Sequence, residues 1–226
     1  MEIFVADIND IYLEKEYCEA FDLLKVDQQD KVNRFRFIAD KKRCMLGILM
    51  LRYGLQKLYG IYLEDIDIVK NEYGKPSLKQ VENIHFNISH SGDYVVCAIG
   101  DEPVGIDVQE MTKVSYSIVE RFFAPEEKQV FDTLDEDEKI DFFFGTWTLK
   151  EAYVKLLGKG LYQPFDKFGI VKENGKYCLF LNGKENHDTH FKEYRLDKGY
   201  RLSICMEKES FPERLISVSC RDMLSY

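Results

Sequence analysis

Two long stretches of the chain repeat hydrophobic residues at the spacing of an amphipathic helix. In segment 39–59, leucines and methionines recur every three or four positions, and the pattern stops at Gly60. Segment 141–160 shows the same spacing and is closed by Gly158 and Gly160. Shorter helices are predicted over 27–37, 115–122 and 125–133.

Short apolar or alternating runs predict strands between these helices. They cover 2–8, 65–71, 85–89, 93–100, 104–109, 200–207 and 215–220. Segment 168–183 is predicted to be a hairpin, because Asn174-Gly175 is typical of a two-residue turn. The polar cluster "NISHS" (87–91) is predicted to form a turn between two strands.

The two halves of the chain resemble each other in plan, since each supplies one long helix and about three strands. We therefore expect an α+β fold of two pseudo-symmetric halves, each a small antiparallel sheet packed with a long helix. No low-complexity linker separates the halves. The loop 101–103 is the expected joint, which gives an N-terminal half of residues 1–103 and a C-terminal half of residues 104–226.

The composition of the chain argues against several classes of protein and site. A formal charge of −9 over 226 residues argues against a general nucleic-acid binder and against anchoring on an anionic membrane. No apolar run approaches the roughly 20 residues that span a bilayer. The six cysteines include no C-x-x-C pair, which argues against a structural zinc site and a disulfide framework. The histidines of "NHDTH" (186–190) lie in a predicted loop and are not favoured as a metal site. We expect a cytoplasmic protein.

One candidate site combines two distant acids, Asp107 and Glu151. Trp147, Glu151 and Lys155 fall on one face of the predicted helix 141–160. If that helix lies across the end of the strand containing Asp107, the two carboxylates can share a Mg²⁺ ion, which prefers oxygen ligands. The alternative is a plain surface ion pair between Glu151 and Lys155, worth about 0.3–0.5 kcal/mol.

Two further features indicate an anionic ligand. Segment 25–44 holds seven basic residues against three acids in an otherwise acidic protein, although a solvated helix face gives the same pattern. "NISHS" (87–91) lacks the G-x-S-x-G elbow of a hydrolase, and its hydroxyls, imidazole and backbone amides suit a phosphate better.

Five motifs, taken in order, resemble the phosphopantetheinyl transferases, in particular the monomeric, surfactin-synthetase-activating type. They are "YGKP" (73–76), "FNISHSG" (86–92), "VGIDVQ" (104–109), "RFFAPEE" (121–127) and "WTLKEAYVKLLGKGL" (147–161). The resemblance implies two α+β halves with coenzyme A in the cleft between them. It also implies transfer of the phosphopantetheine arm of coenzyme A to a serine of an apo carrier protein, with release of 3',5'-ADP.

The resemblance assigns roles position by position. It implies that Asp107, Gln109 and Glu151 hold Mg²⁺ at the pyrophosphate, with Glu151 also the candidate base for the incoming serine. Lys155 would contact the pyrophosphate and offset the charge of the leaving group. The grip on the nucleotide phosphates would come from Lys31, Arg43, Ser89 and His90. Lys75 would lie against the adenine, and Glu127 matches an acid of the metal-site surroundings.

One position departs from the family pattern. Gln109 stands where the closest relatives usually have an acid, so we expect weaker metal affinity rather than lost activity. The rival hypothesis is a catalytically weakened protein that binds coenzyme A or the carrier without transfer.

The resemblance also implies which kind of surface would bind the carrier protein. Carrier proteins commonly present an acidic surface around an apolar helix near their serine. An acidic enzyme then needs a local apolar patch to bind them. Phe122, Phe123 and the region of Tyr116 are the candidates for this patch, with burial in the core as their alternative.

Overall fold

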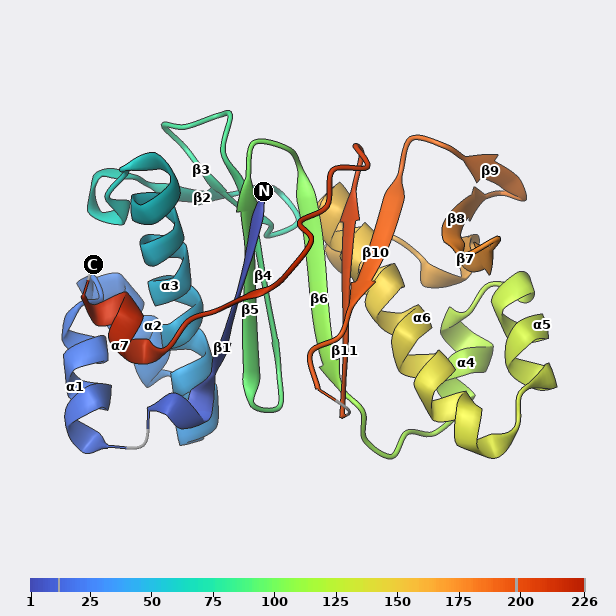
Figure 1. Cartoon of the computed structure of the whole chain (residues 1–226), viewed down its shortest axis with the longest axis horizontal. Coiled ribbons are helices and arrows are strands. Elements are labelled where there is room, and N and C mark those ends of the chain that lie inside the picture. Colours follow the sequence, from blue (N-terminus) through green and yellow to red (C-terminus); the bar gives the residue numbers. More distant parts are fainter. Residues whose placement is uncertain (12, 198, 226) are drawn as a thin grey trace. The chain divides into compact units, whose positions relative to one another are not determined.

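The computed structural model describes residues 1–11, 13–197 and 199–225 of the chain (Figure 1). These residues form two compact units. The first comprises Met1–Val69, Pro76–Asp101 and Pro212–Tyr226, and the second comprises Lys70–Lys75 and Glu102–Phe211. Each unit combines a small, mainly antiparallel sheet with one long helix, so the predicted α+β fold class is confirmed.

The first unit is built on a four-stranded sheet with the order β12-β1-β5-β4. Its strands are β1 (Glu2–Asp7), β4 (His85–Ser91), β5 (Tyr94–Gly100) and β12 (Ile216–Ser217). All neighbours are antiparallel except β12, which runs parallel to β1. The short strands β2 (Ile68–Lys70) and β3 (Pro76–Leu78) form a separate two-stranded ladder.

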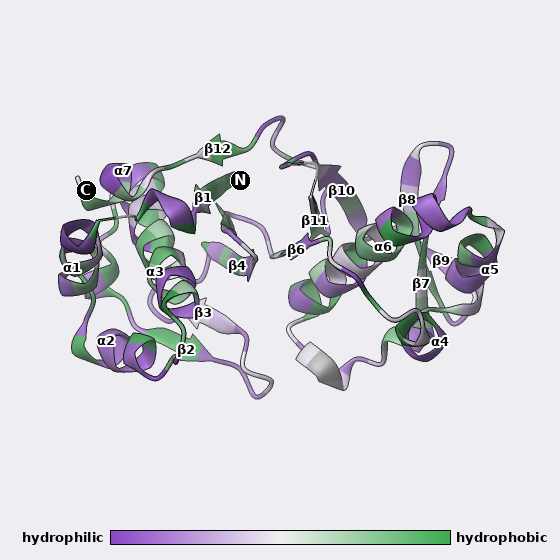
Figure 2. Ribbon diagram, turned by 90° about the horizontal axis from the view of Figure 1, so that it is seen from below, coloured by the Kyte–Doolittle hydropathy of each residue, from purple (hydrophilic) through white to green (hydrophobic). Residues whose placement is uncertain are grey.

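The long helix of the first unit is α3 (Ile38–Tyr59), which packs on the sheet and is surrounded by three shorter helices (Figure 2). These are α1 (Glu14–Asp22), α2 (Val26–Asn33) and α7 (Cys220–Leu224). Short 3-10 turns cover Ile8–Asp10 and Leu63–Asp65. Gly60 ends α3 in the left-handed conformation, as the sequence predicts, and its amide donates to Gln56 O.

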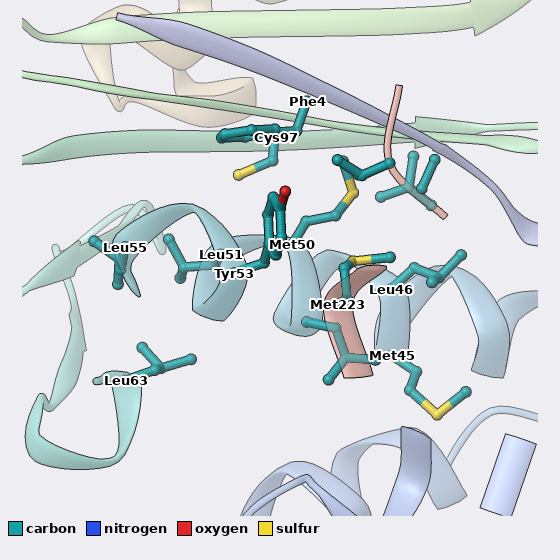
Figure 3. Packing of buried hydrophobic residues seen from close by; sticks show 14 of the residues in the cluster. Phe4, Met45, Leu46, Met50, Leu51, Tyr53, Leu55, Leu63, Cys97 and Met223 are labelled. Carbon is teal, nitrogen blue, oxygen red and sulfur yellow. The ribbon is translucent and has the colours of Figure 1, made fainter. Parts of the chain in front are cut away.

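The core of this unit lies between α3 and the sheet. Phe4 of β1 and Cys97 of β5 lie opposite Tyr53 and Met50 of α3 (Figure 3), and the rings of Phe4 and Tyr53 meet edge to face at 5.6 Å. Met50 and Cys97 are fully buried. Burial of such side chains stabilises a fold by about 1.5–3 kcal/mol each.

The second unit is built on a three-stranded antiparallel sheet with the order β10-β11-β6. Its strands are β6 (Val104–Glu110), β10 (His190–Tyr194) and β11 (Tyr200–Met206). The long helix α6 (Glu136–Leu157) packs on β6 and β11 (Figure 1). Asp135 precedes α6 and forms a capping box with Glu138, so the helix begins earlier than the hydrophobic pattern predicts.

The second unit contains further elements, several of which pack aromatic side chains against α6. They are α4 (Ser117–Phe122), α5 (Pro125–Thr133), β7 (Phe168–Glu173), β8 (Lys176–Leu181), β9 (Lys184–Asn186) and the 3-10 turns Gly160–Tyr162 and Phe165–Lys167. Phe143 of α6 stacks on Phe123 at 5.6 Å and on Trp147 at 5.9 Å. The predicted hairpin turn at Asn174-Gly175 joins β7 to β8.

Helix α6 approaches β6 so closely that only glycine fits at position 105. A Cβ atom added at Gly105 would lie 1.9 Å from Ala152 O and 2.4 Å from Leu156 N. These are backbone atoms of α6, which cannot move aside like a side chain. Gly105 therefore sets the distance between α6 and the strand that carries Asp107.

Three local predictions are wrong. The "NISHS" residues do not form a turn: they continue β4, with Ser89 buried and His90 exposed as in a strand, and the turn falls at Gly92 and Asp93. The predicted strand 215–220 shortens to β12, because Ser219 caps α7 by accepting from Asp222 N. The predicted loop 186–190 contains the end of β9 and the start of β10.

The units also differ from a single division at residue 103. Segment Lys70–Lys75 belongs to the second unit, and the chain from Pro212 onward belongs to the first. The chain from Pro212 onward belongs to the first unit because β12 pairs with β1 and α7 packs on α1 and α3. Within the described ranges, no helix is long and apolar enough to cross a membrane.

Candidate active site

Helix α6 and strand β6 bring Asp107, Glu151 and Lys155 together in the second unit. Asp107 is buried, with 2% of its surface exposed, on the face of β6 that α6 covers. Lys155 Nζ donates to Asp107 Oδ1 at 2.5 Å and to Ile106 O at 3.1 Å. The interpretation of Glu151 and Lys155 as a plain surface pair does not describe this arrangement, because the lysine bonds to a buried acid on another element.

Glu151 is close enough to Asp107 for the two charges to interact. Burial, together with the charge of Asp107, raises the pKa of the Glu151 carboxyl to about 7, against the lowering effect of Lys155. The two carboxylates repel each other in this partly buried site, and a bound divalent cation would offset that repulsion.

Gln109 takes part in the same cluster. Its Nε2 donates to Asp107 Oδ2 at 3.1 Å, so both oxygens of Asp107 accept hydrogen bonds. The alternation of β6 places Gln109 on the face of Asp107 and turns Glu110 outward, where it is exposed. The side-chain amide of Gln109 therefore lies beside Asp107 with its nitrogen toward the carboxylate, and Glu110 does not replace it.

The donor set fits a hard cation such as Mg²⁺. Among residues 1–11, 13–197 and 199–225, no group of three or more His, Cys, Asp or Glu side chains could hold a metal ion. A metal at this cluster would be held by the carboxylates of Asp107 and Glu151 and the amide oxygen of Gln109. Mg²⁺ commonly takes one or two protein carboxylates and completes its shell with water and substrate phosphates.

Glu151 leads to a prediction about stability. Its pKa of about 7 in the folded protein exceeds the ordinary 4.5, so folding strengthens proton binding. This contribution to stability is complete below about pH 4.5 and is lost as the pH rises through about 7. Glu151→Gln removes a carboxylate that burial and Asp107 disfavour in its charged form. We therefore expect it to raise the free energy of unfolding at about pH 8 by about 1 kcal/mol, a figure that already allows for solvent screening.

The measurement is urea unfolding of both proteins without added metal at about pH 8 and about pH 5. The difference in the free energy of unfolding between the two proteins should shrink toward zero at the lower pH, because Glu151 is then protonated and uncharged in the folded protein. Glu110→Gln is the matched control, because Glu110 is exposed on the other face of β6. A Glu151→Gln protein that is less stable at both pH values would contradict the prediction.

The predicted phosphate-binding residues lie in the first unit. Arg43 of α3 donates to Gly92 O at 2.5 Å and pairs with Asp40 at 2.6 Å, which fixes its guanidinium at the turn after "NISHS". Lys31 of α2 is exposed and lies near Cys44 of α3. Burial raises the pKa of the Cys44 thiol, and the charge of Lys31 partly offsets this rise. The structure thus brings Arg43 to the end of β4, the strand that carries Ser89 and His90.

Lys75 has a structural role that the sequence did not indicate. Its Nζ donates to Leu156 O at 3.0 Å and to Val104 O at 3.3 Å, at the carboxyl end of α6. Asn71 Nδ2 donates to Gly158 O at 2.9 Å in the same place. A cation at this end complements the helix dipole. Burial lowers the pKa of the Lys75 ammonium to about 8.

Glu127 is fully buried and ion-paired with Lys150. Lys150 Nζ donates to the two carboxylate oxygens at 2.8 Å and 2.7 Å and to Phe168 O at 2.6 Å. The same carboxylate accepts from Ile170 N and Ala124 N, each at 2.7 Å. This pair ties α5 and β7 to α6, and only the apolar surroundings of Lys150 in "TLKEAYV" could have indicated it from sequence.

The predicted apolar patch is part of the core. Phe123 is 1% exposed and stacks on Phe143, while Phe122 meets Trp147 edge to face and Tyr116 packs on Phe131. A group of adjacent exposed apolar side chains lies instead in the first unit. Phe35, Phe37 and Ile38 are 38%, 62% and 57% exposed at the junction of α2 and α3.

Comparison with known proteins identifies the family. The 4'-phosphopantetheinyl transferase superfamily matches residues 103–205, and the family described as 4'-phosphopantetheinyl transferase, N-terminal, matches residues 13–101. The chain belongs to the 4'-phosphopantetheinyl transferase superfamily.

Relatives of the surfactin-synthetase-activating type match most of the chain. It is 34% identical to 4'-phosphopantetheinyl transferase Sfp of Bacillus subtilis (strain 168) over 94% of its own length and 95% of that protein. It is 37% identical to 4'-phosphopantetheinyl transferase gsp of Aneurinibacillus migulanus over 79% of this chain and 74% of that one. The structure of Thermotoga maritima holo-[acyl-carrier-protein] synthase matches 47% of the chain and 64% of its own, with 29% identity and a TM-score of 0.39.

Proposed function

We propose that this protein transfers the 4'-phosphopantetheine arm of coenzyme A to a serine of apo acyl or peptidyl carrier proteins and releases 3',5'-ADP, with Mg²⁺ as cofactor. The observation that carries the proposal is the cluster in which Asp107 and Glu151 lie close together beside Lys155. Membership of the superfamily supports the same reaction. We further propose that the protein acts as a monomer in the cytoplasm.

The reaction is a phosphoryl transfer, in which the protein supplies positioning and neutralises charge. The serine oxygen attacks the β-phosphorus of the diphosphate, the bond to the bridging oxygen breaks, and 3',5'-ADP leaves with the electron pair. Bound Mg²⁺ would polarise the phosphorus and stabilise the leaving phosphate. Asp107, Gln109 and Glu151 would hold the ion, and Glu151 would accept the serine proton, directly or through water.

Lys155 is proposed to change partners during the reaction. In the structure its ammonium neutralises Asp107. With the metal on Asp107, the ammonium can turn to the diphosphate and offset the charge that develops on the leaving group. Lys31, Arg43, Ser89 and His90 of the first unit are proposed to bind the nucleotide phosphates, and Lys75 of the second unit is proposed to lie against the adenine.

The deciding experiment incubates the protein with coenzyme A, Mg²⁺ and an apo carrier domain and follows the mass of the carrier. The proposal requires a gain of one phosphopantetheine on the carrier serine. A carrier whose serine is replaced by alanine is the control. Coenzyme A binding without any mass gain would favour the rival hypothesis of a non-catalytic binding protein, for which Gln109 is the structural support.

Gln109 leads to a prediction about the metal. We expect Gln109→Glu to lower the Mg²⁺ concentration for half-maximal transfer by about threefold to tenfold, because a third carboxylate adds charge to the ion's ligands. Mn²⁺ binding to the complex with coenzyme A, followed by EPR, should tighten in parallel. Gln129→Glu on the exposed face of α5 makes the same chemical change elsewhere and should alter neither value. An unchanged metal requirement in Gln109→Glu would contradict the prediction.

The carrier is proposed to bind the segment 33–38, at the junction of α2 and α3. All six residues of this segment are exposed, and residues 34–37 alternate basic and aromatic side chains. Arg36 lies over the ring of Phe37 at 5.4 Å. An apolar surface surrounded by positive charge complements an acidic carrier surface around an apolar helix.

We expect Phe37→Glu to raise the KM for the carrier by about tenfold, because it places a charge in an apolar contact and repels an acidic partner. The KM for coenzyme A should stay the same, which separates this effect from damage to the catalytic cluster. Leu13→Glu changes an exposed apolar residue elsewhere in the first unit and serves as the control. Steady-state kinetics with the carrier varied at saturating coenzyme A measures the effect.

A further inference from the structure

Two adjoining pockets lie in the second unit on residues that the proposed reaction does not use. One has a volume of about 620 Å³ and is lined by residues of α5, the first half of α6, β7, β8, β10 and β11. The other has a volume of about 550 Å³ and is lined by β8, β10 and residues 209–211 among others. Asp107, Glu151 and Lys155 line neither pocket.

The larger pocket combines an apolar wall with the acids Asp137, Glu138 and Asp141, and we call it the apolar pocket. Its hydrophobic lining residues are Val130, Leu134, Phe142, Leu149, Ile170 and Val171. Gly145 of α6 also lines it and leaves room that a side chain would occupy. Its volume falls in the range of about 300–1,000 Å³ that is usual for small-molecule sites.

The smaller pocket is basic and aromatic, and we call it the basic pocket. Five basic residues line it against two acids, Glu193 and Glu209, although the whole chain carries a formal charge of −9. The basic residues are Lys172, Lys176, Lys192, Arg195 and Arg201. Four aromatic rings line it as well, from Tyr177, Phe191, Tyr194 and Phe211. A concave surface of this kind favours an anion that carries a flat apolar group.

The two pockets share a wall that contains Tyr177, Glu193 and Arg201. The hydroxyl of Tyr177 donates to Glu193, and Arg201 pairs with Glu193 and with Asp141 of α6. These contacts hold the shared wall in one arrangement. Because the same side chains border both pockets, one ligand can occupy the two together.

Arg201 carries a buried donor in the shared wall. Its Nε is buried and finds no hydrogen-bond partner among the described residues, although its two other nitrogens are ion-paired. Buried donors without a partner are uncommon in folded proteins.

We propose that the apolar and basic pockets form one binding site for a small aromatic acid, with its anionic group in the basic pocket and its apolar part in the apolar pocket. The proposal does not depend on the transferase activity. The site borders the catalytic cluster through one contact, since Arg201 of β11 lies opposite Gln109 of β6 in the strand register.

The test uses 8-anilinonaphthalene-1-sulfonate, an aromatic sulfonate whose fluorescence rises in apolar surroundings, with the full chain. We expect saturable binding of one molecule per chain, unchanged by saturating coenzyme A. The double variant Lys172→Glu/Arg195→Glu reverses two charges on exposed residues of the basic pocket and should weaken binding by about tenfold or more. Lys184→Glu on β9, outside both pockets, should leave it unchanged.

A second variant separates the apolar pocket from general charge attraction. Val130 is 39% exposed, so Val130→Trp can fill part of the apolar pocket without disturbing the core, and it should also weaken binding. Thermal unfolding of each variant without the probe checks that it is folded. Displacement of the probe by coenzyme A, binding without saturation, or equal affinity in the double variant and in Lys184→Glu would each overturn the proposal.

Discussion

Asp107→Asn should reduce the rate of phosphopantetheine transfer by about a thousandfold while the protein remains folded. Asparagine has the shape of aspartate, so it can keep the hydrogen bond to Gln109 with its amide oxygen. It removes the negative charge that Lys155 Nζ contacts at 2.5 Å and that a divalent cation would need. The side chain is buried, so solvent cannot supply a replacement charge.

The rate is measured by mass spectrometry of the carrier at saturating coenzyme A. Glu110→Gln is the matched control, because it removes one negative charge three residues further along the chain, at the exposed end of β6 and on its other face, and should keep nearly full activity. Coenzyme A affinity is measured in parallel by calorimetry. Transfer by Asp107→Asn at more than about a tenth of the wild-type rate would show that the cluster is not the catalytic centre.

Lys150→Met is expected to have the largest effect on stability, a loss of about 3–5 kcal/mol in the free energy of unfolding. The side chains of Lys150 and Glu127 are both 0% exposed. Removal of the lysine leaves a buried carboxylate with two backbone amides and no cation. It also deprives Phe168 O of its donor.

Urea unfolding followed by tryptophan fluorescence measures this loss in the second unit alone. The chain has a single tryptophan, Trp147, which packs on Phe143 and Phe122 in that unit. Lys139→Met makes the same substitution in the same helix, in a pair with the exposed Glu136, and should lower the free energy of unfolding far less.

The double variant Glu127→Gln/Lys150→Met separates the lost charge from the lost packing. It should recover part of the stability, because the glutamine oxygen can still accept from a backbone amide and no unpaired charge is buried. If Lys150→Met and Lys139→Met are equally stable, Glu127 is not held as a buried ion in solution.

The sequence predicts the elements whose signals are local. Helix α3 ends at Gly60, and the hairpin turns at Asn174-Gly175, because each position needs a backbone conformation that these residues adopt easily. The "NISHS" segment was misassigned because its polar residues suggested a turn. The alternation of Phe86, Ile88 and the polar residues between them was the better signal, and that alternation is what β4 uses.

The meeting of Asp107 and Glu151 could be predicted from the sequence, because it requires only that one helix crosses one strand. The sequence predicts a strand that contains Asp107 and a helix that contains Glu151. Only the packing of that helix on that strand had to be assumed. The pair of Glu127 and Lys150 depends on α5, α6 and β7 meeting at one point. The exposure of Phe37 and the burial of Phe123 likewise follow from tertiary packing, because the same residue type faces opposite environments in the two units.

The pairing of β12 with β1 has a consequence for synthesis on the ribosome. The first unit contains both the earliest and the latest residues of the chain, and the second unit lies between them in sequence. Because domains fold as they emerge, the second unit can finish folding while the first still lacks β12 and α7. The nascent chain can therefore complete its second unit first, and β1 keeps an unpaired edge until β12 has been translated.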